Sequence, residues 1–574
     1  MNAAIESAHS LQPALRPAPD SVFNQAPPLP DIDLFSSDEA LIDALARERG
    51  TAAHDELAAI GVDLGRAANA ELARLANQFS PVLKTFDARG NRVDRIEFHP
   101  AWHELMNGIV ARGFHASPWG DADAKAPAHR HLSRAAGYLM QARIEQGTLC
   151  PTTMTYGAIA AMKRDPRLAS EWVPKLLSRE YDPRDVPFSE KRGGLVGMGM
   201  TEKQGGSDVR ANTSVAEKSA DDSYRLTGHK WFFSAPQCDA HLVLANMADG
   251  GLSCFFVPRF TPDGAKNAVH IQRLKDKVGN RSNASSEVEF HGAWGHLIGE
   301  PGRGVPIILE MGTYTRLDCV IGSAGMMREA VVQAIHHASH RAAFGKRLVD
   351  QPLMQSVLAD LAIESEAATA LAMRLARAFD AEDDESETLF RRVMTSASKF
   401  WVCKRGPELA AEAMEVLGGN GYVEEGPLAR IYREMPVNSI WEGSGNIMCL
   451  DVLRAFAKSS RSADIVLAEF SAQRGCHRAY DAALDGFEDR LTCRAFDEAS
   501  ARCMARELVV LEQAALLLQS GSSAMAEAFC ATRLSRQAGA GSVFGLLPEG
   551  LAALPLIDRA WPQLSLDAGG SAQR

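Results

Sequence analysis

The sequence predicts an α+β protein that is mostly helical. Long stretches of helical periodicity lie on both sides of a segment, Gly193–Gly299, that is rich in short β-type runs and turn residues. At 574 residues the chain also exceeds one ordinary core, so several domains are expected. The predicted order is an N-terminal helical domain, a central β-domain, a four-helix bundle and a C-terminal helical extension.

The beginning of the chain predicts a flexible lead followed by the N-terminal helical domain. Residues 1–37 are rich in proline and lack an apolar block beside positive charge, so this part does not resemble a secretory signal. In the segment 38–190, apolar residues recur three and four positions apart, as in Leu57, Ile60 and Leu64. This spacing is typical of helices with one buried face.

The predicted β-domain covers 191–300. Turn residues such as Asp249-Gly250-Gly251 separate the β-rich runs, which suggests a sheet pair or a small barrel. The six runs are Leu195–Met200, Tyr224–Thr227, His241–Ala245, Ser253–Val257, Val269–Leu274 and Val288–Phe290.

Long helical patterns return in the segment 301–460, which predicts the four-helix bundle. The acidic run 381–387 is expected to be a solvated loop between two of its helices. The segment 461–574 predicts the C-terminal extension, helical over about 462–545, with 567–574 disordered. The four bundle helices are expected at Val305–Met326, Arg328–Ala343, Gln351–Asp380 and Leu389–Leu417.

Composition excludes several classes of protein. The net charge of −11 argues against nonspecific binding of nucleic acid by the protein as a whole. No apolar run reaches the roughly eighteen residues that a transmembrane helix needs. The ten cysteines lack the spacing of a disulfide framework or a zinc site, so we expect no metal and a reducing, cytoplasmic location.

The first β-rich run leads into a glycine-rich loop that ends at Asp208. Thr201 and Ser207 add hydroxyl groups to the backbone N–H groups that such a loop can offer to a planar or phosphorylated ligand. The loop matches neither the dinucleotide-binding fingerprint nor the Walker A motif, because a β-run follows it and Gly-Lys-Ser/Thr is absent. An ordinary hairpin loop is the alternative interpretation.

Three aromatic residues precede a hydroxyl in Trp231-Phe232-Phe233-Ser234. Aromatic runs usually belong to a core, which is one interpretation of this segment. Beside a ligand-binding loop, the same residues would form a wall for a flat cofactor.

A single carboxylate lies between an aromatic ring and two glycines in Trp441-Glu442-Gly443-Ser444-Gly445-Asn446. Glycine lets the backbone pass close to a ligand, and exclusion of water by Trp441 would raise the proton affinity of Glu442. Glu442 is therefore a candidate general base near neutral pH, although a solvated loop glutamate is the alternative.

These motifs occur in the order found in the acyl-CoA dehydrogenase flavoproteins, which the chain resembles from about Pro151 to Ser460. The longer matches also resemble the AidB branch of that family, which is linked to the adaptive response to DNA alkylation. Val22–Gln25 and Phe98–His103 look like that branch too, so the resemblance covers nearly the whole chain. The motifs shared with the family are Thr201-Glu202 with Gly206-Ser207-Asp208, Lys230 to Ser234, Arg341-x-x-Phe344-Gly345-Lys346, Leu417–Tyr422 and Trp441–Ser444. The longer matches, which resemble the AidB branch, are Gly199–Asp208, Leu274–Ala284 and Met435–Met448.

The resemblance implies a homotetramer, a dimer of dimers, with FAD between the β-domain and the bundle. It also implies that Arg341 and Phe344 reach the FAD of a neighbouring subunit and that Gly418 and Gly419 approach its adenine end. The full set of implied cofactor-binding residues is Met200, Thr201, Gly206, Ser207, Phe232, Phe233, Ser234, Arg341, Phe344, Gly418, Gly419, Ile440, Trp441, Gly443, Ser444, Gly445 and Asn446.

The activity implied by the resemblance is α,β-dehydrogenation of a short or branched acyl-CoA such as isovaleryl-CoA. Glu442 would remove the proton next to the thioester carbonyl while flavin N5 accepts the hydride, and another flavoprotein could accept the electrons. Some relatives carry the base on an earlier helix, but Thr315 stands there in this chain. Arg316 is then a substrate-pocket or structural residue.

Two other functions stay open. The AidB branch implies binding of double-stranded DNA in the alkylation response, with little dehydrogenase turnover. Residues 455–574 carry 12 Lys/Arg against 14 Asp/Glu, which weakens that alternative because DNA affinity depends on neutralised phosphates. A basic face could still be formed by Arg502, Arg506, Arg533 and Arg536. A flavin kept only as a scaffold is the third alternative.

Overall fold

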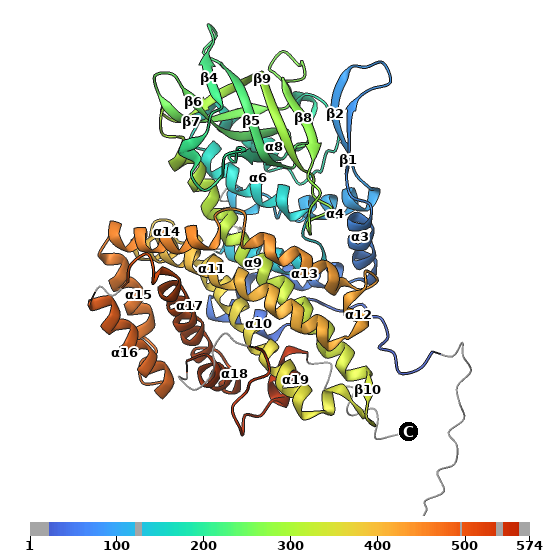
Figure 1. Cartoon of the computed structure of the whole chain (residues 1–574), viewed down its shortest axis with the longest axis vertical. Coiled ribbons are helices and arrows are strands. Elements are labelled where there is room, and N and C mark those ends of the chain that lie inside the picture. The colour runs from blue at the N-terminus through green and yellow to red at the C-terminus, as the bar shows by residue number, and fades with distance from the viewer. Residues whose placement is uncertain (1–21, 121–128, 494–495, 535–542, 562–574) are drawn as a thin grey trace, which may run out of the picture.

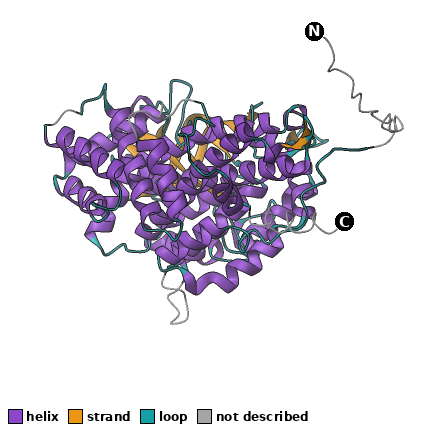
Figure 2. Cartoon of the chain, turned by 90° about the horizontal axis from the view of Figure 1, so that it is seen from below, coloured by secondary structure: helices purple, strands orange, loops and turns teal. Residues whose placement is uncertain are grey.

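The computed structural model describes residues 22–120, 129–493, 496–534 and 543–561. Figure 1 shows the β-domain above a large helical body, with the C-terminal helices packed against one side of that body. Figure 2 shows that helices cover the side of the molecule that faces away from the strands. The predicted mostly helical α+β fold with a central β-domain and C-terminal helices is confirmed.

The N-terminal domain is helical except for one hairpin. The predicted lead is shorter than 37 residues, because Ile32, Leu34 and Phe35 are packed in the core. The hairpin β1–β2 lies where helix was expected. Half-buried and exposed residues alternate along β1, and Gly90 closes the turn in the left-handed region, φ 84°. The elements are α1 Glu39–Arg47, α2 His54–Leu64, α3 Ala67–Gln78, β1 Val82–Phe86, β2 Arg92–Glu97, α4 Pro100–Ala111, α5 Arg130–Ile144, α6 Leu149–Met162, α7 Pro166–Glu171 and α8 Val173–Leu176.

The β-domain is a small barrel with two appended strands. β6 pairs with β7, β7 with β9, β9 with β5, β5 with β4 and β4 with β6, so the ladder returns to its first strand. β4 was missed in the sequence, and β5 and β9 run further than predicted. The strands are β3 Val196–Gly199, β4 Val215–Lys218, β5 Tyr224–Ser234, β6 Ala240–Met247, β7 Gly251–Pro258, β8 Val269–Leu274 and β9 Ser285–Ile298.

The bundle is built around α9, a single helix of 37 residues where the sequence predicted two. It packs against α5 and α6 of the N-terminal domain and against α10, α11 and α13. The acidic run is an exposed loop as far as Asp384, whose side chain caps the next helix. The elements are α9 Gly304–His340, β10 Ala342–Ala343, β11 Lys346–Arg347, α10 Pro352–Phe379, α11 Glu385–Val416, α12 Gly419–Tyr422, α13 Pro427–Asn438 and α14 Gly445–Lys458.

The C-terminal extension packs against α10 and α11 through α17. Its helices are α15 Arg461–Ser471, α16 Arg478–Thr492, α17 Ala501–Leu518, α18 Ser523–Phe529 and α19 Leu554–Ala560. The predicted disorder of 567–574 and of 1–21 concerns residues outside the described ranges. Within those ranges, no helix combines the length and apolar character needed to cross a bilayer.

Candidate functional site

Glu442 lies on the short loop between α13 and α14 in a constrained backbone conformation. Its φ of 59° is in the left-handed region, which costs a residue other than glycine about 1–3 kcal/mol unless the surroundings fix it. Arg316 Nε donates to the Glu442 carbonyl at 2.9 Å, and Lys399 Nζ donates to the Gly443 carbonyl at 2.8 Å. Basic side chains from α9 and α11 therefore hold the loop in place.

The glycine after Glu442 is required by its surroundings. Gly443 has a φ of 107°, and a Cβ atom added there would lie 2.4 Å from Met448 Cε. Both the backbone angle and the close approach exclude a side chain. The predicted reason for the glycine next to the carboxylate, passage of backbone through a confined space, is thus visible in the structure.

The Glu442 carboxylate accepts a hydrogen bond from the Thr315 hydroxyl, with 2.6 Å between Oγ1 and Oε2. Burial raises the pKa of Glu442, and the Thr315 hydrogen bond and the charges of Lys399 and Arg316 oppose this without cancelling it. The position at which some relatives carry a base therefore holds a donor to the candidate base Glu442. The raised pKa suits a group that removes a proton near neutral pH.

Replacing Thr315 by valine is expected to move the pH dependence of flavin reduction by substrate to higher pH. Glu442 acts when it is deprotonated, and the Thr315 hydrogen bond stabilises that form. Losing a hydrogen bond to a charged group, worth about 1.5–3 kcal/mol, should raise the pKa of Glu442 by about one unit or more. Stopped-flow rates of anaerobic flavin reduction against pH measure the shift.

The matched control is Thr313→Val on the same helix, where the hydroxyl bonds only to the Leu309 carbonyl. Its profile should stay at the wild-type position. An unchanged profile for Thr315→Val would contradict the assignment of Glu442 as the titrating base.

Arg316 joins the Glu442 loop to α14. Besides the Glu442 carbonyl, its guanidinium contacts Asp451 of α14 at 3.2 Å, and Asp451 also accepts hydrogen bonds from Arg392 and Ser396. Arg316 thus holds the loop through Nε and Nη1, as the structural alternative predicts. A role in the substrate pocket stays a prediction.

The glycine-rich loop after β3 is tied down by a buried carboxylate. Glu202 accepts from Lys230 Nζ at 2.6 Å and from the backbone N–H of Thr213 at 2.6 Å. Burial alone would raise the pKa of Glu202, but Lys230 and the other donors lower it to about 2. At Gly206 a Cβ atom would lie 2.4 Å from Thr201 Oγ1, so only glycine leaves this hydroxyl in place. The loop is thus a rigid cradle that includes Thr201.

The aromatic strand β5 presents its residues to opposite sides. Phe232 is half exposed beside the Lys275 ammonium, 4.5 Å from the ring centroid, and Ser234 Oγ lies 3.4 Å from Ser285 Oγ. Phe233 is buried in the barrel and stacks on His241. Because successive side chains of a strand alternate, Phe233 does not share the face of Phe232 and Ser234, in contrast to the sequence prediction.

Cys150 on α6 brings the barrel and the Glu442 loop together. Burial raises the pKa of Cys150 to about 12, and the charge of Glu442 also raises it. The charge of Lys277 and hydrogen bonds with Asn283 and Ser234 lower the pKa without cancelling this effect. The thiol therefore has Ser234 of the barrel and Glu442 of the bundle as neighbours. No local sequence pattern around Cys150 indicates this position.

Lys277 was also missed as a site residue. Burial lowers its pKa to about 8, and its Nζ donates to the Asn283 carbonyl at 2.6 Å. Lys277 lies in the stretch Leu274–Ala284, which resembles the AidB branch but contains none of the residues predicted to bind the cofactor. The region between β5, α6 and the Glu442 loop is consequently more polar than the motifs alone suggested.

A second group of predicted cofactor residues lies at the other end of the bundle. Arg341 follows the end of α9, and Phe344 in the β10–β11 turn is 99% exposed. Gly418 and Gly419 have open space around them, and the segment Asn24–Gln25 bonds to both places, to Ala342 and to Asn420.

The two groups cannot serve one ligand within one chain. From Thr315 to the end of α9 at His340 there are 25 residues, which corresponds to about 38 Å of straight helix. Arg341 and Phe344 are therefore remote from Glu442 of the same chain. The sequence prediction that they serve a neighbouring subunit is consistent with this separation.

The remaining predicted cofactor residues surround the Glu442 loop or the glycine-rich loop. Trp441 donates from Nε1 to Asn438, and Ser444 and Gly445 begin α14. Ser207, Ile440 and Asn446 are exposed, and Met200 is half buried at the end of β3. Apart from Phe233 and the remote group, the predicted residues lie at the end of β3, on the glycine-rich loop, on β5, on the Glu442 loop or at the start of α14.

The arginines proposed as a DNA-binding face are engaged in intramolecular contacts. Arg533 forms ion pairs with the buried Asp360 and Glu364 of α10. Arg502 and Arg506 lie over aromatic rings of α11, those of Phe400 and Trp401. Arg536 is outside the described residues. At least Arg533 is thus unavailable to phosphates.

The junction of barrel and bundle fits a flat cofactor with a phosphorylated tail. The Thr201–Ser207 loop offers hydroxyls and closely approaching backbone, and the half-exposed Phe232 offers a ring face. Within the described ranges, His, Cys, Asp and Glu side chains form no group of three or more that could hold a metal ion.

Three protein-family descriptions match consecutive parts of the chain. The Adaptive response protein AidB N-terminal domain matches residues 24–183, the acyl-CoA dehydrogenase middle domain matches 197–293, and the acyl-CoA dehydrogenase C-terminal domain matches 302–457. The matches follow the order N-terminal helices, barrel and bundle.

Individual relatives agree with these matches. The chain is 50% identical over 520 residues, 90% of its length and 95% of the relative's, to "Putative acyl-CoA dehydrogenase AidB" of Escherichia coli (strain K12). The crystal structure of Caenorhabditis elegans ACDH-11 in complex with C11-CoA superposes with a TM-score of 0.81 at 26% identity, over 92% of this chain and 95% of that one. An acyl-CoA dehydrogenase from Bacillus anthracis, complexed with FAD, shares the fold at a TM-score of 0.60 and 18% identity, over 82% of this chain and 85% of that one.

Proposed function

Because the chain belongs to the acyl-CoA dehydrogenase family and carries the AidB N-terminal domain, we propose that it oxidises a short or branched acyl-CoA with FAD as cofactor. One observation carries the proposal: a buried carboxylate with a raised pKa, Glu442, on a loop that three neighbouring side chains hold in position.

The chain's own residues would perform the proton chemistry. Glu442 removes the proton next to the thioester carbonyl, and Thr315 orients the carboxylate through its hydroxyl. The backbone N–H of Glu442 is the donor proposed for the developing enolate oxygen. Arg316 and Lys399 keep this loop in position, and the burial of the carboxylate keeps water away.

FAD, which the family typically binds, supplies the hydride acceptor when it is present. The loop containing Thr201 and Ser207 would hold its phosphates, and Phe232 and Ser234 would lie against its ring system. A second flavoprotein is proposed as the acceptor of the electrons.

The proposal is tested by anaerobic titration of the flavin-loaded protein with acyl-CoA thioesters. The panel should run from isovaleryl-CoA to an eleven-carbon acyl-CoA, since the ACDH-11 structure contains C11-CoA. We expect loss of the oxidised flavin absorbance with at least one member. If no acyl-CoA reduces the flavin, the proposed activity is wrong.

We further propose a homotetramer in which Arg341 and Phe344 of one subunit contact the FAD of another. Replacing Arg341 by methionine should then weaken FAD binding about tenfold or more, because a charge-assisted contact to phosphate is lost. The ratio of flavin to protein absorbance after gel filtration measures retention, and sedimentation velocity reports the assembly.

Arg347→Met is the control on the same hairpin, where Arg347 pairs with Asp350. It should retain FAD. Full retention of FAD by Arg341→Met would contradict the shared site.

The similarity to AidB makes binding of double-stranded DNA in the alkylation response a second candidate. The charge of the extension and the pairing of Arg533 lead us to expect only weak binding, seen at about 50 mM salt and lost at about 200 mM. Fluorescence anisotropy of a labelled duplex at several salt concentrations measures this. Tight binding at physiological salt would instead favour the DNA function.

A further inference from the structure

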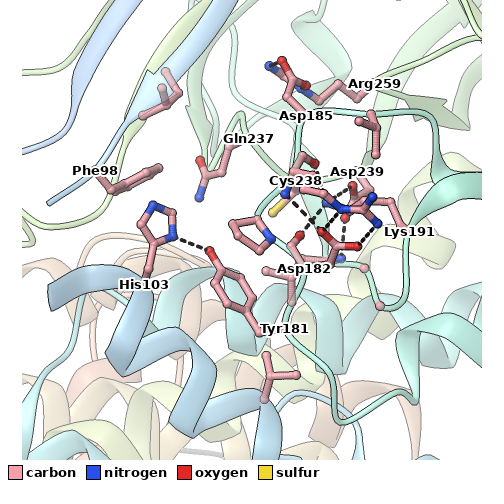
Figure 3. A pocket seen from close by; sticks show the side chains of 18 of the residues that line it. Phe98, His103, Tyr181, Asp182, Asp185, Lys191, Gln237, Cys238, Asp239 and Arg259 are labelled. Atoms are coloured by element: carbon pink, nitrogen blue, oxygen red, sulfur yellow. Dashed lines mark hydrogen bonds and ion pairs between the residues drawn. The ribbon is translucent and has the colours of Figure 1, made fainter. Parts of the chain in front are cut away.

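A cavity of about 730 Å³ lies between the N-terminal domain and the barrel, separate from the Glu442 loop (Figure 3). Phe98, Trp102 and His103 line it from the end of β2 and from α4. The segment after α8 contributes Tyr181, and the turn between β5 and β6 contributes Gln237. This volume is within the range of small-molecule sites.

Two polar groups in the cavity lack partners among the described residues. Neither the amide oxygen nor the amide nitrogen of Gln237 has a hydrogen-bond partner there, although both atoms are buried. The indole Nε1 of Trp102 is also buried and has no hydrogen-bond partner among the described residues. Figure 3 shows the Gln237 side chain extending into the space between Phe98, His103 and Tyr181. Buried polar groups are almost always paired, so this amide and indole are suited to bind something that enters.

The ionisable side chains around Gln237 are uncharged at neutral pH, which restricts the class of ligand that can bind there. Burial lowers the pKa of His103 and raises the pKa of Tyr181, so both are neutral at pH 7, and His103 Nδ1 lies 2.9 Å from the Tyr181 hydroxyl. Burial also raises the pKa of the Cys238 thiol well above its usual range. The interior beside Gln237 therefore carries no net charge that would select an ion.

Four charged residues of the cavity wall are paired with each other. Lys191 Nζ lies 3.1 Å from Asp239, and Arg259 Nε lies 2.7 Å from Asp185. Arg95, which also lines the cavity, is exposed and forms no ion pair with another described residue. An anionic ligand such as a phosphate ester would have to break these pairs to use Lys191 or Arg259 as a counter-ion.

We propose that this cavity binds a neutral flat molecule that presents a hydrogen-bond donor and an acceptor side by side, as an aromatic carboxamide or a nucleobase does. The primary amide of Gln237 would pair with both groups, the arrangement by which glutamine recognises adenine elsewhere. Trp102 Nε1 would donate to a further acceptor. Phe98, which stacks on Trp102 with ring centroids 3.8 Å apart, supplies the apolar wall against the ring.

The turn that carries Gln237 separates this cavity from the proposed catalytic site. Ser234 at the end of β5 is a neighbour of Cys150 near Glu442, whereas Gln237, three residues later, lines the cavity. Neither Glu442 nor Thr315 lines the cavity, so a ligand bound there does not contact the candidate base.

The test uses the full-length flavin-loaded protein and three probes: benzamide, adenine and benzoate. Isothermal titration calorimetry or ligand-observed NMR should show benzamide or adenine binding, with benzoate at least tenfold weaker because it is charged. The relative affinity of benzamide and adenine distinguishes a simple carboxamide from a nucleobase. Benzoate binding as tightly as benzamide, or no binding of either neutral probe up to its solubility limit, overturns the proposal.

Gln237→Leu removes both hydrogen-bonding atoms at similar size and should weaken binding about tenfold or more. Gln272→Leu on β8, where the amide contacts only Glu289 at the surface, is the matched control and should leave affinity unchanged. Unchanged affinity in Gln237→Leu overturns the assignment. A competition measurement on the wild-type protein needs no variant. If benzamide and adenine both bind, each must displace the other from the cavity. Simultaneous binding of the two probes would overturn the proposal of one common site.

Discussion

Replacing Glu442 by glutamine is expected to abolish bleaching of the bound flavin by an acyl-CoA under anaerobic conditions. The amide keeps the size of the side chain and can still accept from Thr315, but it cannot remove a proton. Loss of a general base lowers rates by about 10²–10⁴-fold, so the flavin of the variant should stay oxidised over the time in which the wild type is fully reduced. The measurement is absorbance of the oxidised flavin after mixing with the best substrate of the panel.

The control for this variant is Glu382→Gln, which alters a carboxylate that contacts Tyr314 of α9 but not the Glu442 loop. It should reduce its flavin at the wild-type rate. The flavin content of Glu442→Gln must also equal that of the wild type, so that lost bleaching reports the base. Bleaching that survives in Glu442→Gln would sink the assignment.

The largest effect on stability is expected for Arg533→Met. Arg533 joins the C-terminal extension to the bundle by pairing with Asp360 at 2.6 Å and with Glu364 at 3.0 Å, and both carboxylates are almost completely buried. Glu364 keeps Arg405 as a partner, whereas Asp360 retains no ion-pair partner among the described residues. Breaking a buried pair from one side costs about 3–5 kcal/mol in the free energy of unfolding. Urea unfolding followed by circular dichroism measures the loss.

Arg461→Met provides the comparison, because Arg461 of the same extension pairs with Glu385 at an exposed position. Surface pairs contribute about 0–1 kcal/mol, so its unfolding midpoint should hardly change. Equal effects of the two substitutions would show that Arg533 does not stabilise the junction of extension and bundle.

The fold and the centre of the candidate site could be predicted because their signals are local. Short β-rich runs between turn residues identified six of the seven strands of the sheet, and the glycines around Glu442 indicated a confined loop. The alternation of side chains along a strand explains the error at Phe233: three consecutive aromatics cannot all face one side of a strand. The hairpin β1–β2 was missed because its strands are short and lie within a helical context.

The remaining features depend on residues that are distant in the sequence. Cys150 is near Glu442, and Lys277 is near Cys150, only because α6, the loop after β8 and the α13–α14 loop meet. The pairing of Arg533 with α10 likewise spans more than 160 residues, so counting charges in the extension could weaken the DNA alternative but could not show where each arginine lies. The contact of Arg316 with Asp451 could not be predicted for the same reason, since Asp451 follows 135 positions later.

Helix α9 has a consequence for how the chain can be divided. Every residue from 317 to 332 is buried, so these four turns have no face for water and are covered by α5 and α6 on one side and by α10 and α11 on the other. The N-terminal helices and the bundle are therefore one folding unit, although a different family domain matches each of them. A fragment that begins at the barrel would expose a wide apolar surface and aggregate, which makes the domains of this protein recognisable in sequence but inseparable in practice.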